Sequence, residues 1–166
     1  MGTTQAVSQV QDDTVPEQRV SRFCYRIGTH FLLLESTVKA EILTGQHVYP
    51  LPFAPTWCAG LTSVRGDLFP VIDMHQVVQG QSAQQKPQLL FMEHPQFPPV
   101  ILTCDGIPRL LKLAKTNVME QADSSLPGWI PHTLQHDGQA LLVADHGRLL
   151  RHIYRTSGIT PAKTTL

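Results

Sequence analysis

The apolar residues of this chain occur in short runs of strand length, and glycine or proline separates most of them. The runs span residues 23–27, 30–35, 63–73, 88–92 and 99–107. Two of the tight turns between runs, at 28–29 and 65–66, predict β-hairpins over 22–34 and 61–72. Many short strands punctuated by glycine and proline are typical of small barrels or sandwiches.

Helical periodicity is rare. Residues 37–43 (TVKAEIL) fit two turns of helix, and residues 73–78 fit a short one. The strongest helix prediction is 145–154, with Asp145 as N-cap and an apolar face made by Leu149, Leu150, Ile153 and Tyr154. Pro70 lies inside a strand pattern, so we expect an edge or a bulge there.

A weak internal repeat suggests two similar β units of about 70 residues each. Pro, Trp, Gly, Val and Asp recur at one offset of 72 residues, as 55/127, 57/129, 66/138, 71/143 and 73/145. Upstream, residues 31–34 resemble 100–103 at an offset of 69. Units of this size are marginal alone, so we expect them to pack together. As repeat equivalents, Asp73 and Asp145 are interpreted as helix caps.

The polar ends of the chain, 1–20 and 157–166, are predicted to be mobile tails around an ordered domain at 21–156. The first residues show no signal-peptide pattern, and no segment approaches the length of a membrane span. The simplest prediction is a soluble cytoplasmic protein.

Composition excludes several classes of function. Among 166 residues, 13 Lys and Arg balance 13 Asp and Glu, so the basic excess of a nucleic-acid binder is absent. The 42% hydrophobic content excludes a wholly disordered chain. Cys24, Cys58 and Cys104 contain no Cys-x-x-Cys, which predicts reduced, mostly buried thiols rather than disulfides or a zinc ribbon.

We find no motif that carries catalysis or binds a cofactor. The chain lacks a phosphate loop, a G-x-S-x-G elbow and HExxH. His132 and His136 have helical ligand spacing, but Pro131 and Gly138 predict a loop with exposed or edge histidines. The sequence therefore predicts no metal and no cofactor. A cysteine- or histidine-based hydrolase remains an alternative that only distant residues could build.

Arg65 is the strongest candidate for a functional residue. It lies at the predicted hairpin tip next to Gly66, where its guanidinium suits pairing with a carboxylate or with backbone carbonyls. Its repeat equivalent is Asp137, so the turn itself does not need a cation. Glu41, beside Ile42, fits either a solvated helix face or the charged rim of an apolar docking patch.

Several motifs resemble the chemotaxis coupling protein family CheW. The resemblance covers about residues 22–155 and is strongest over 60–73, GLTSVRGDLFPVID. The motifs FCYRIG, AEIL, LPFAP and VADHGRLL, at 23–28, 40–43, 51–55 and 143–150, add to it. The ends and the low charge are also similar to PilI-type members of twitching-motility systems. Thr62 and Ser63 depart from the family signature, where an apolar residue and Asn are usual.

The resemblance implies a mainly β fold of two intertwined five-stranded SH3-like barrels with a few short helices, the first at about 22–85 and the second at about 86–156. It implies a non-enzymatic adaptor that couples the cytoplasmic tips of chemoreceptors to a CheA-type histidine kinase, without binding nucleic acid or inserting into the membrane. Such adaptors gather on the inner face of the membrane in receptor arrays. The coupling residues carried over are Arg65, Gly60, Val64, Gly66, Glu41 and Ile42. A general kinase-docking scaffold without receptor contact is the alternative.

Overall fold

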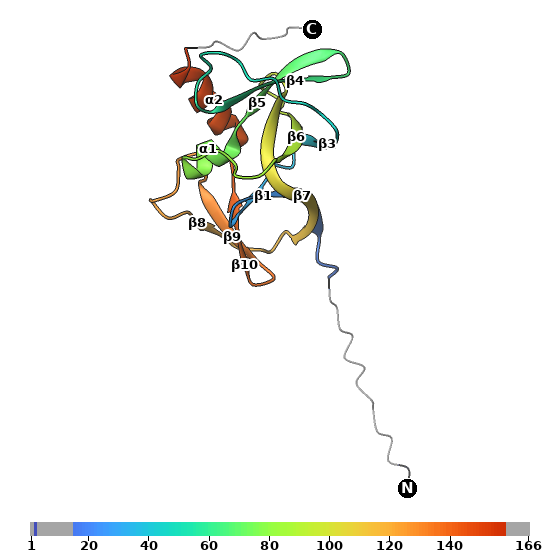
Figure 1. Ribbon diagram of the computed structural model, residues 1–166. Helices are drawn as coiled ribbons and strands as arrows, with labels where there is room; N and C mark the ends of the chain where they lie inside the picture. The colour runs from blue at the N-terminus through green and yellow to red at the C-terminus, as the bar shows by residue number, and fades with distance from the viewer. Residues whose placement is uncertain (1, 3–14, 159–166) are drawn as a thin grey trace.

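The computed structural model describes residue 2 and residues 15–158, and these form a mainly β protein, as predicted (Figure 1). The strands are β1 Arg19–Ile27, β2 His30–Leu33, β3 Lys39–Leu43, β4 Cys58–Val64, β5 Asp67–Ile72, β6 Gln88–Glu93, β7 Val100–Ala114, β8 Met119–Gln121, β9 His132–His136 and β10 Gln139–Val143. The helices are α1 Met74–Gln79 and α2 His146–Thr156. None of the helices within 15–158 is long and apolar enough to cross a membrane.

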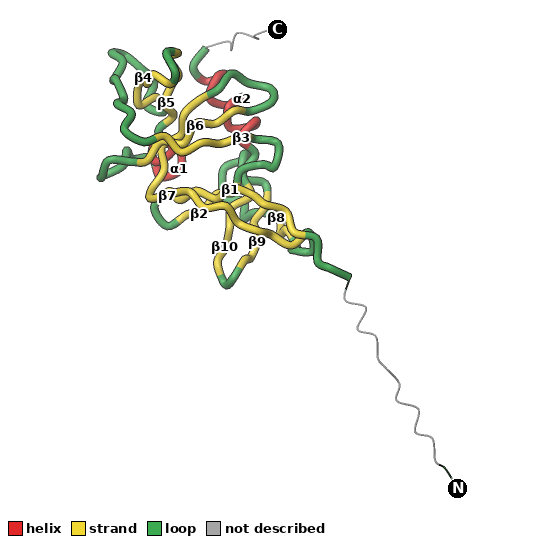
Figure 2. The backbone as a smooth tube through the Cα atoms, turned by 90° about the vertical axis from the view of Figure 1, so that its right-hand side faces the viewer, coloured by secondary structure: helices red, strands yellow, loops and turns green. Residues whose placement is uncertain are grey.

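The strands form two sheets that share the long strand β7. The first sheet joins β3, β6, the start of β7, β5 and β4. The second sheet joins the end of β7 to β1, β2, β10, β9 and β8. Figure 2 shows β3 to β6 on one side of β7 and β8 to β10 on the other.

Strand pairing does not follow the predicted division near residue 85. The N-terminal strands β1 and β2 pair with the C-terminal half of the chain, while β6 pairs with β3. β7 runs through both sheets. β1 and β2 of the first repeat therefore pair in the second sheet and β6 of the second repeat pairs in the first, so the two repeats are intertwined. β1 begins at Arg19, inside the segment predicted as a tail, and Ser157 caps α2. The remaining tail predictions, at 3–14 and 159–166, lie outside the described residues.

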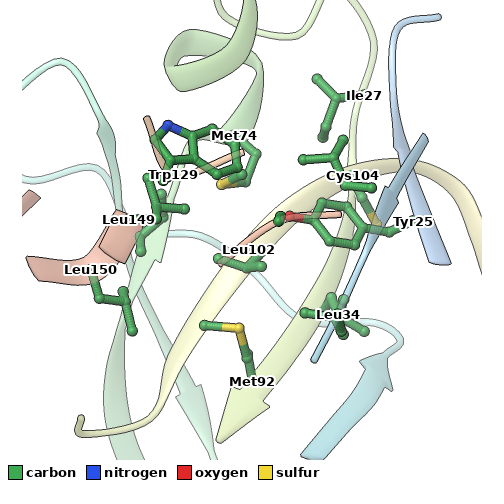
Figure 3. Close-up of a cluster of buried hydrophobic side chains, with 14 of the residues drawn as sticks. Tyr25, Ile27, Leu34, Met74, Met92, Leu102, Cys104, Trp129, Leu149 and Leu150 are labelled. Atoms are coloured by element: carbon green, nitrogen blue, oxygen red, sulfur yellow. The ribbon is translucent and has the colours of Figure 1, made fainter. Parts of the chain in front are cut away.

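Three apolar clusters correspond to this arrangement. One cluster packs against the first sheet and contains Val71 and Ile101. A second cluster packs against the second sheet and contains Leu33 and Val143. The largest cluster lies between the sheets and brings Trp129 and Leu149 together with Met74 and Leu102 (Figure 3). Side chains alternate between clusters along each strand, since successive strand residues face opposite sides. Leu102 therefore faces the shared core, while Ile101 faces the first sheet.

The 72-residue repeat appears as duplicated contacts. The N–H of Asp73 donates to the carbonyl of Trp57 over 2.7 Å, and the N–H of Asp145 donates to the carbonyl of Trp129 over the same distance. Both aspartates cap the helix that follows, through Gln76 N (3.0 Å) and Arg148 N (2.9 Å). Their interpretation as caps is confirmed.

The upstream part of the repeat is one residue away from the predicted register. Val71 pairs with Ile101 and Val143 pairs with Leu33, which gives an offset of 68 rather than 69. In this register Thr103 and Glu35 are equivalent, and each accepts a hydrogen bond from the first N–H of the following helix, α1 or α2.

Two local predictions are wrong. Residues 37–43 are not helical: β3 forms there, because β6 supplies a complete antiparallel ladder from Lys39 to Leu43. Its burial alternates along the strand, a period-two pattern that the helical reading overlooked. The stretch at 132–136 is also a strand, because β8 and β10 both pair with it. Pro131 precedes that ladder and Gly138 follows it.

Candidate functional site

The β4–β5 turn places Arg65 at the end of a tight hairpin. Arg65 and Gly66 have positive φ angles of 53° and 89°, the combination that a two-residue hairpin of primed type requires. Asp137 and Gly138 repeat it with 48° and 75° in the β9–β10 turn. The backbone of the turn is therefore common to both units, whereas the guanidinium occurs only in the first.

Arg65 and Glu41, both singled out from the sequence, lie together. Nη2 of Arg65 donates to Oε1 of Glu41 over 2.9 Å and to Oε2 over 2.7 Å. The hydrogen bonds and charge of Glu41 raise the pKa of Arg65, which stays cationic at any physiological pH. Both side chains are exposed, at 67% and 50%, so the pair contributes little to the stability of the fold.

The other two side chains of the predicted site are less exposed than this pair. Val64 is buried among the apolar residues of the first sheet, directly before the turn. Ile42 is half-buried and packs against the shared core on the opposite side of β3 from Glu41. Glu41 and Ile42 therefore do not form one continuous exposed patch. Ile42 anchors the strand that carries Glu41, and Val64 anchors the hairpin that carries Arg65.

Gly60 allows the loop between β3 and β4 to close against β4. Tyr49 and Leu61 exchange backbone hydrogen bonds of 2.8 and 2.9 Å. Gly60 has a φ of 143°, and a Cβ there would collide with the backbone carbonyl of Tyr49. Gly66, in contrast, has open space around its missing side chain and is needed only for its φ angle.

Exposed apolar side chains in this part of the chain were not assigned a role from the sequence. Tyr49, Leu51 and Phe53 lie on the loop that Gly60 admits, and Leu68 follows the Arg65 turn; Phe53 and Leu68 are among the most exposed large apolar residues. Exposed apolar residues such as Leu68, three positions from Arg65, are typical of interaction surfaces. The LPFAP motif at 51–55, one of the motifs that carry the family resemblance, is the sequence signal for this loop.

The cysteines are poor nucleophiles in this fold. Burial raises the pKa of Cys24 to about 11 and that of Cys104 to about 12, and it also raises the pKa of Cys58. Thiolate is therefore scarce at neutral pH. All three are free thiols, in agreement with the sequence prediction.

Two histidines in the first turns of α1 and α2 are buried against carboxylates. His146 Nδ1 lies 2.7 Å from Glu35 and its Nε2 lies 2.7 Å from the hydroxyl of Tyr25. His75 lies between Thr103 and Asp105, at 3.1 and 2.8 Å. Over residues 15–158, no three His, Cys, Asp or Glu side chains gather as a metal site would require.

The fold and this geometry define a class: a two-sheet β module with a charged pair at an exposed hairpin tip. The chain belongs to the family of CheW-like domains, whose model matches residues 23–154. This confirms the resemblance drawn from the sequence motifs.

Two individual proteins add to the assignment. Protein FrzA of Myxococcus xanthus is 37% identical over 59 residues, which are 36% of this chain and 36% of FrzA, so the match spans about a third of that relative. The crystal structure of the scaffolding protein TtCheW from Thermoanaerobacter tengcongensis superimposes with a TM-score of 0.63. It covers 76% of this chain and 89% of TtCheW at 14% identity, a likeness of fold.

Proposed function

We propose that this protein is a non-enzymatic adaptor that couples chemoreceptors to a CheA-type histidine kinase, in chemotaxis or in twitching motility driven by type IV pili. The observation that carries the proposal is the Arg65–Glu41 pair on the hairpin of a CheW-like domain. A guanidinium held by one carboxylate at an exposed turn still has donors free for a partner's carboxylate or carbonyl groups.

Coupling in this proposal is mechanical. The first sheet would bind the regulatory domain of the kinase, burying about 800 Å² on each partner. Arg65 would contact the cytoplasmic tip of the receptor, aided by Gly60, Val64 and Gly66, which shape the hairpin, and by Glu41 and Ile42 on β3. The receptor then alters the kinase through a coupling free energy and without a covalent change in the adaptor. Receptor binding would gather the protein at the cytoplasmic face of the membrane.

A calorimetric titration of the full chain against a CheA-type regulatory domain tests the kinase contact. Specific 1:1 binding, tighter than about 100 μM and weakened by Glu41→Ala, is the expected result. The matched control is Glu120→Ala, an exposed glutamate on β8 of the other sheet. A folded protein that binds no kinase domain contradicts the proposal.

Pull-down with and without receptor tips separates this function from the alternative, a general scaffold that docks a kinase without receptor contact. A receptor-dependent gain in kinase recovery that Arg65→Ala abolishes supports coupling. Equal recovery in both conditions favours the scaffold.

A further inference from the structure

A cleft of about 440 Å³ lies where the two repeats meet, away from the Arg65 hairpin. Its apolar walls come from repeat-equivalent positions: Trp57 and Trp129 from the loops before β4 and β9, and Val77 and Leu149 from α1 and α2. Figure 1 shows α1 and α2 on the same side of the molecule. Trp57 is only half-buried, and its Nε1 donates to Ser157 Oγ over 2.8 Å at the end of α2.

One side of α2 borders this cleft with a basic stripe. Arg148, Arg151, His152 and Arg155 are all exposed. At 100° per residue these positions lie within about 100° of the helix surface; Arg148 and His152 adjoin the apolar side that lines the cleft, and Arg151 lies farthest from it. Arg148 and His152 also line the cleft itself. The stripe and the apolar cleft therefore form one continuous surface, called here the α2 surface.

Of the three arginines in the stripe, one is already paired. Arg148 pairs with the cap residue Asp145 at 3.2 Å. Arg151 and Arg155 make no ion pair with any residue of the described part of the chain. Three arginines on one side of an eleven-residue helix also stand out in a chain of zero formal charge.

The repeat shows that the fold does not require the charges of Arg148 and Arg151. At the offset of 72, the equivalents of Arg148 and Arg151 are Gln76 and Gln79 on α1. Both helices start with the same aspartate cap and pack an apolar side inward. Since α1 does so with glutamine at both positions, Arg148 and Arg151 are not needed to start or pack such a helix; Arg155 has no equivalent in α1, which ends at Gln79.

We propose that the α2 surface binds an acidic amphipathic helix of a partner protein. Arg151 and Arg155 are one helical turn apart, the spacing of carboxylates at positions i and i+4 on such a helix, and guanidinium pairs with carboxylate through two parallel hydrogen bonds. An apolar side chain of the same helix enters the cleft between the tryptophans. A phosphate backbone would match the stripe but would leave the apolar cleft unfilled. This site is independent of the proposed coupling through Arg65.

The protein carries its own reporter for the test. Trp57 and Trp129 are the two tryptophans of the chain, and both line the cleft. The probe is a synthetic twenty-residue helical peptide with Glu at i and i+4 and Leu on the adjoining face; its control has Gln in place of Glu. We expect the Glu peptide to produce a saturable change in tryptophan emission, and the Gln peptide to bind at least about tenfold more weakly.

Matched variants locate the contact. Arg151→Glu with Arg155→Glu should weaken the Glu peptide by about tenfold or more. Lys86→Glu with Lys115→Glu, which makes the same change in net charge at exposed positions elsewhere, should leave binding unchanged. Circular dichroism checks that each variant is folded. Arg65→Ala should bind the peptide normally, so failure here is separate from failure of the coupling proposal.

Three outcomes overturn the inference. One is absence of binding by the folded wild-type protein, and another is equal binding by the Arg151/Arg155 variant. The third is an equal response, with the same charge-reversal sensitivity, to vesicles containing phosphatidylglycerol or to duplex oligonucleotide. That response would make the α2 surface a polyanion site without the apolar contact.

Discussion

Nη2 of Arg65 donates to both carboxylate oxygens of Glu41, although 24 residues separate the two along the chain. The contact joins edge strand β3 to the β4–β5 turn, two elements that share no backbone ladder. An exposed pair of this kind contributes little to folding, so its value lies in where it holds the guanidinium.

A double-mutant cycle on this pair should give a small coupling free energy. Arg65→Ala and Glu41→Ala are each expected to change the free energy of unfolding by less than about 1 kcal/mol, with an interaction of at most about 1 kcal/mol. Urea unfolding of the four proteins measures it. A coupling above about 2 kcal/mol would show that the pair supports the fold, and would remove the argument that Arg65 is kept for a partner.

Substitution of the two hairpin glycines should separate close approach from backbone strain. Gly60→Ala should destabilise the protein by at least ~2 kcal/mol, because its Cβ collides with the carbonyl of Tyr49. Gly66→Ala has open space and should cost about 1 kcal/mol, from its φ angle alone. Equal losses in chemical denaturation would contradict the close approach of the β3–β4 loop to β4.

Acid stability should depend on Glu35. Burial acts to raise the pKa of Glu35, but its hydrogen bonds and charge interaction with His146 outweigh burial and lower the pKa below its usual 4.5. The folded state therefore binds this proton less readily than the unfolded chain. Its contribution is present above the unfolded pKa and is lost as pH falls through the folded pKa.

Glu35→Gln should accordingly be less stable at neutral pH and should lose less of its remaining stability below about pH 4.5. Thermal unfolding between pH 3 and 7 measures both effects. Glu120→Gln, exposed on β8, is the control and should follow the wild type. Parallel curves for Glu35→Gln and wild type would show that the Glu35–His146 contact contributes no pH dependence.

Thiol reactivity tests the burial of the cysteines. With pKa values of about 11 and about 12, Cys24 and Cys104 should react with an aromatic disulfide at neutral pH only as fast as the protein opens. Cys58 is partly exposed and should react first, although its pKa is also raised. Fast modification of Cys104 in the native protein would restore the thiol hydrolase as an alternative.

Cys58→Ser and Cys104→Ser should leave kinase binding intact.

The features that were predicted correctly from the sequence depend on neighbouring residues. The 65–66 turn requires positive φ at two consecutive positions, and glycine at the second adopts it without steric strain. Asp73 and Asp145 cap helices through N–H groups three residues ahead. Family motifs such as 60–73 combine such local signals, so they identified the family and placed Arg65 on its hairpin before any contact was known.

Other features depended on pairing between distant segments. Residues 37–43 became a strand because β6 lies beside them, and 132–136 became one because β8 and β10 do. The exchange of β1, β2 and β6 between the sheets follows from the course of β7, which no local pattern in the sequence reveals.

The sequence by itself determined the turns, the helix caps, the repeat and the membership in a family, because each rests on interactions within a few residues or on short motifs. Only the tertiary structure decided that Glu41 meets Arg65, that Glu35 meets His146 across 111 residues, and that Arg148 of α2 lines a cleft together with two tryptophans. These contacts depend on which strands pair and how the sheets pack. That choice is made by the burial of apolar surface over the whole domain, and the local pattern around any one residue does not contain it.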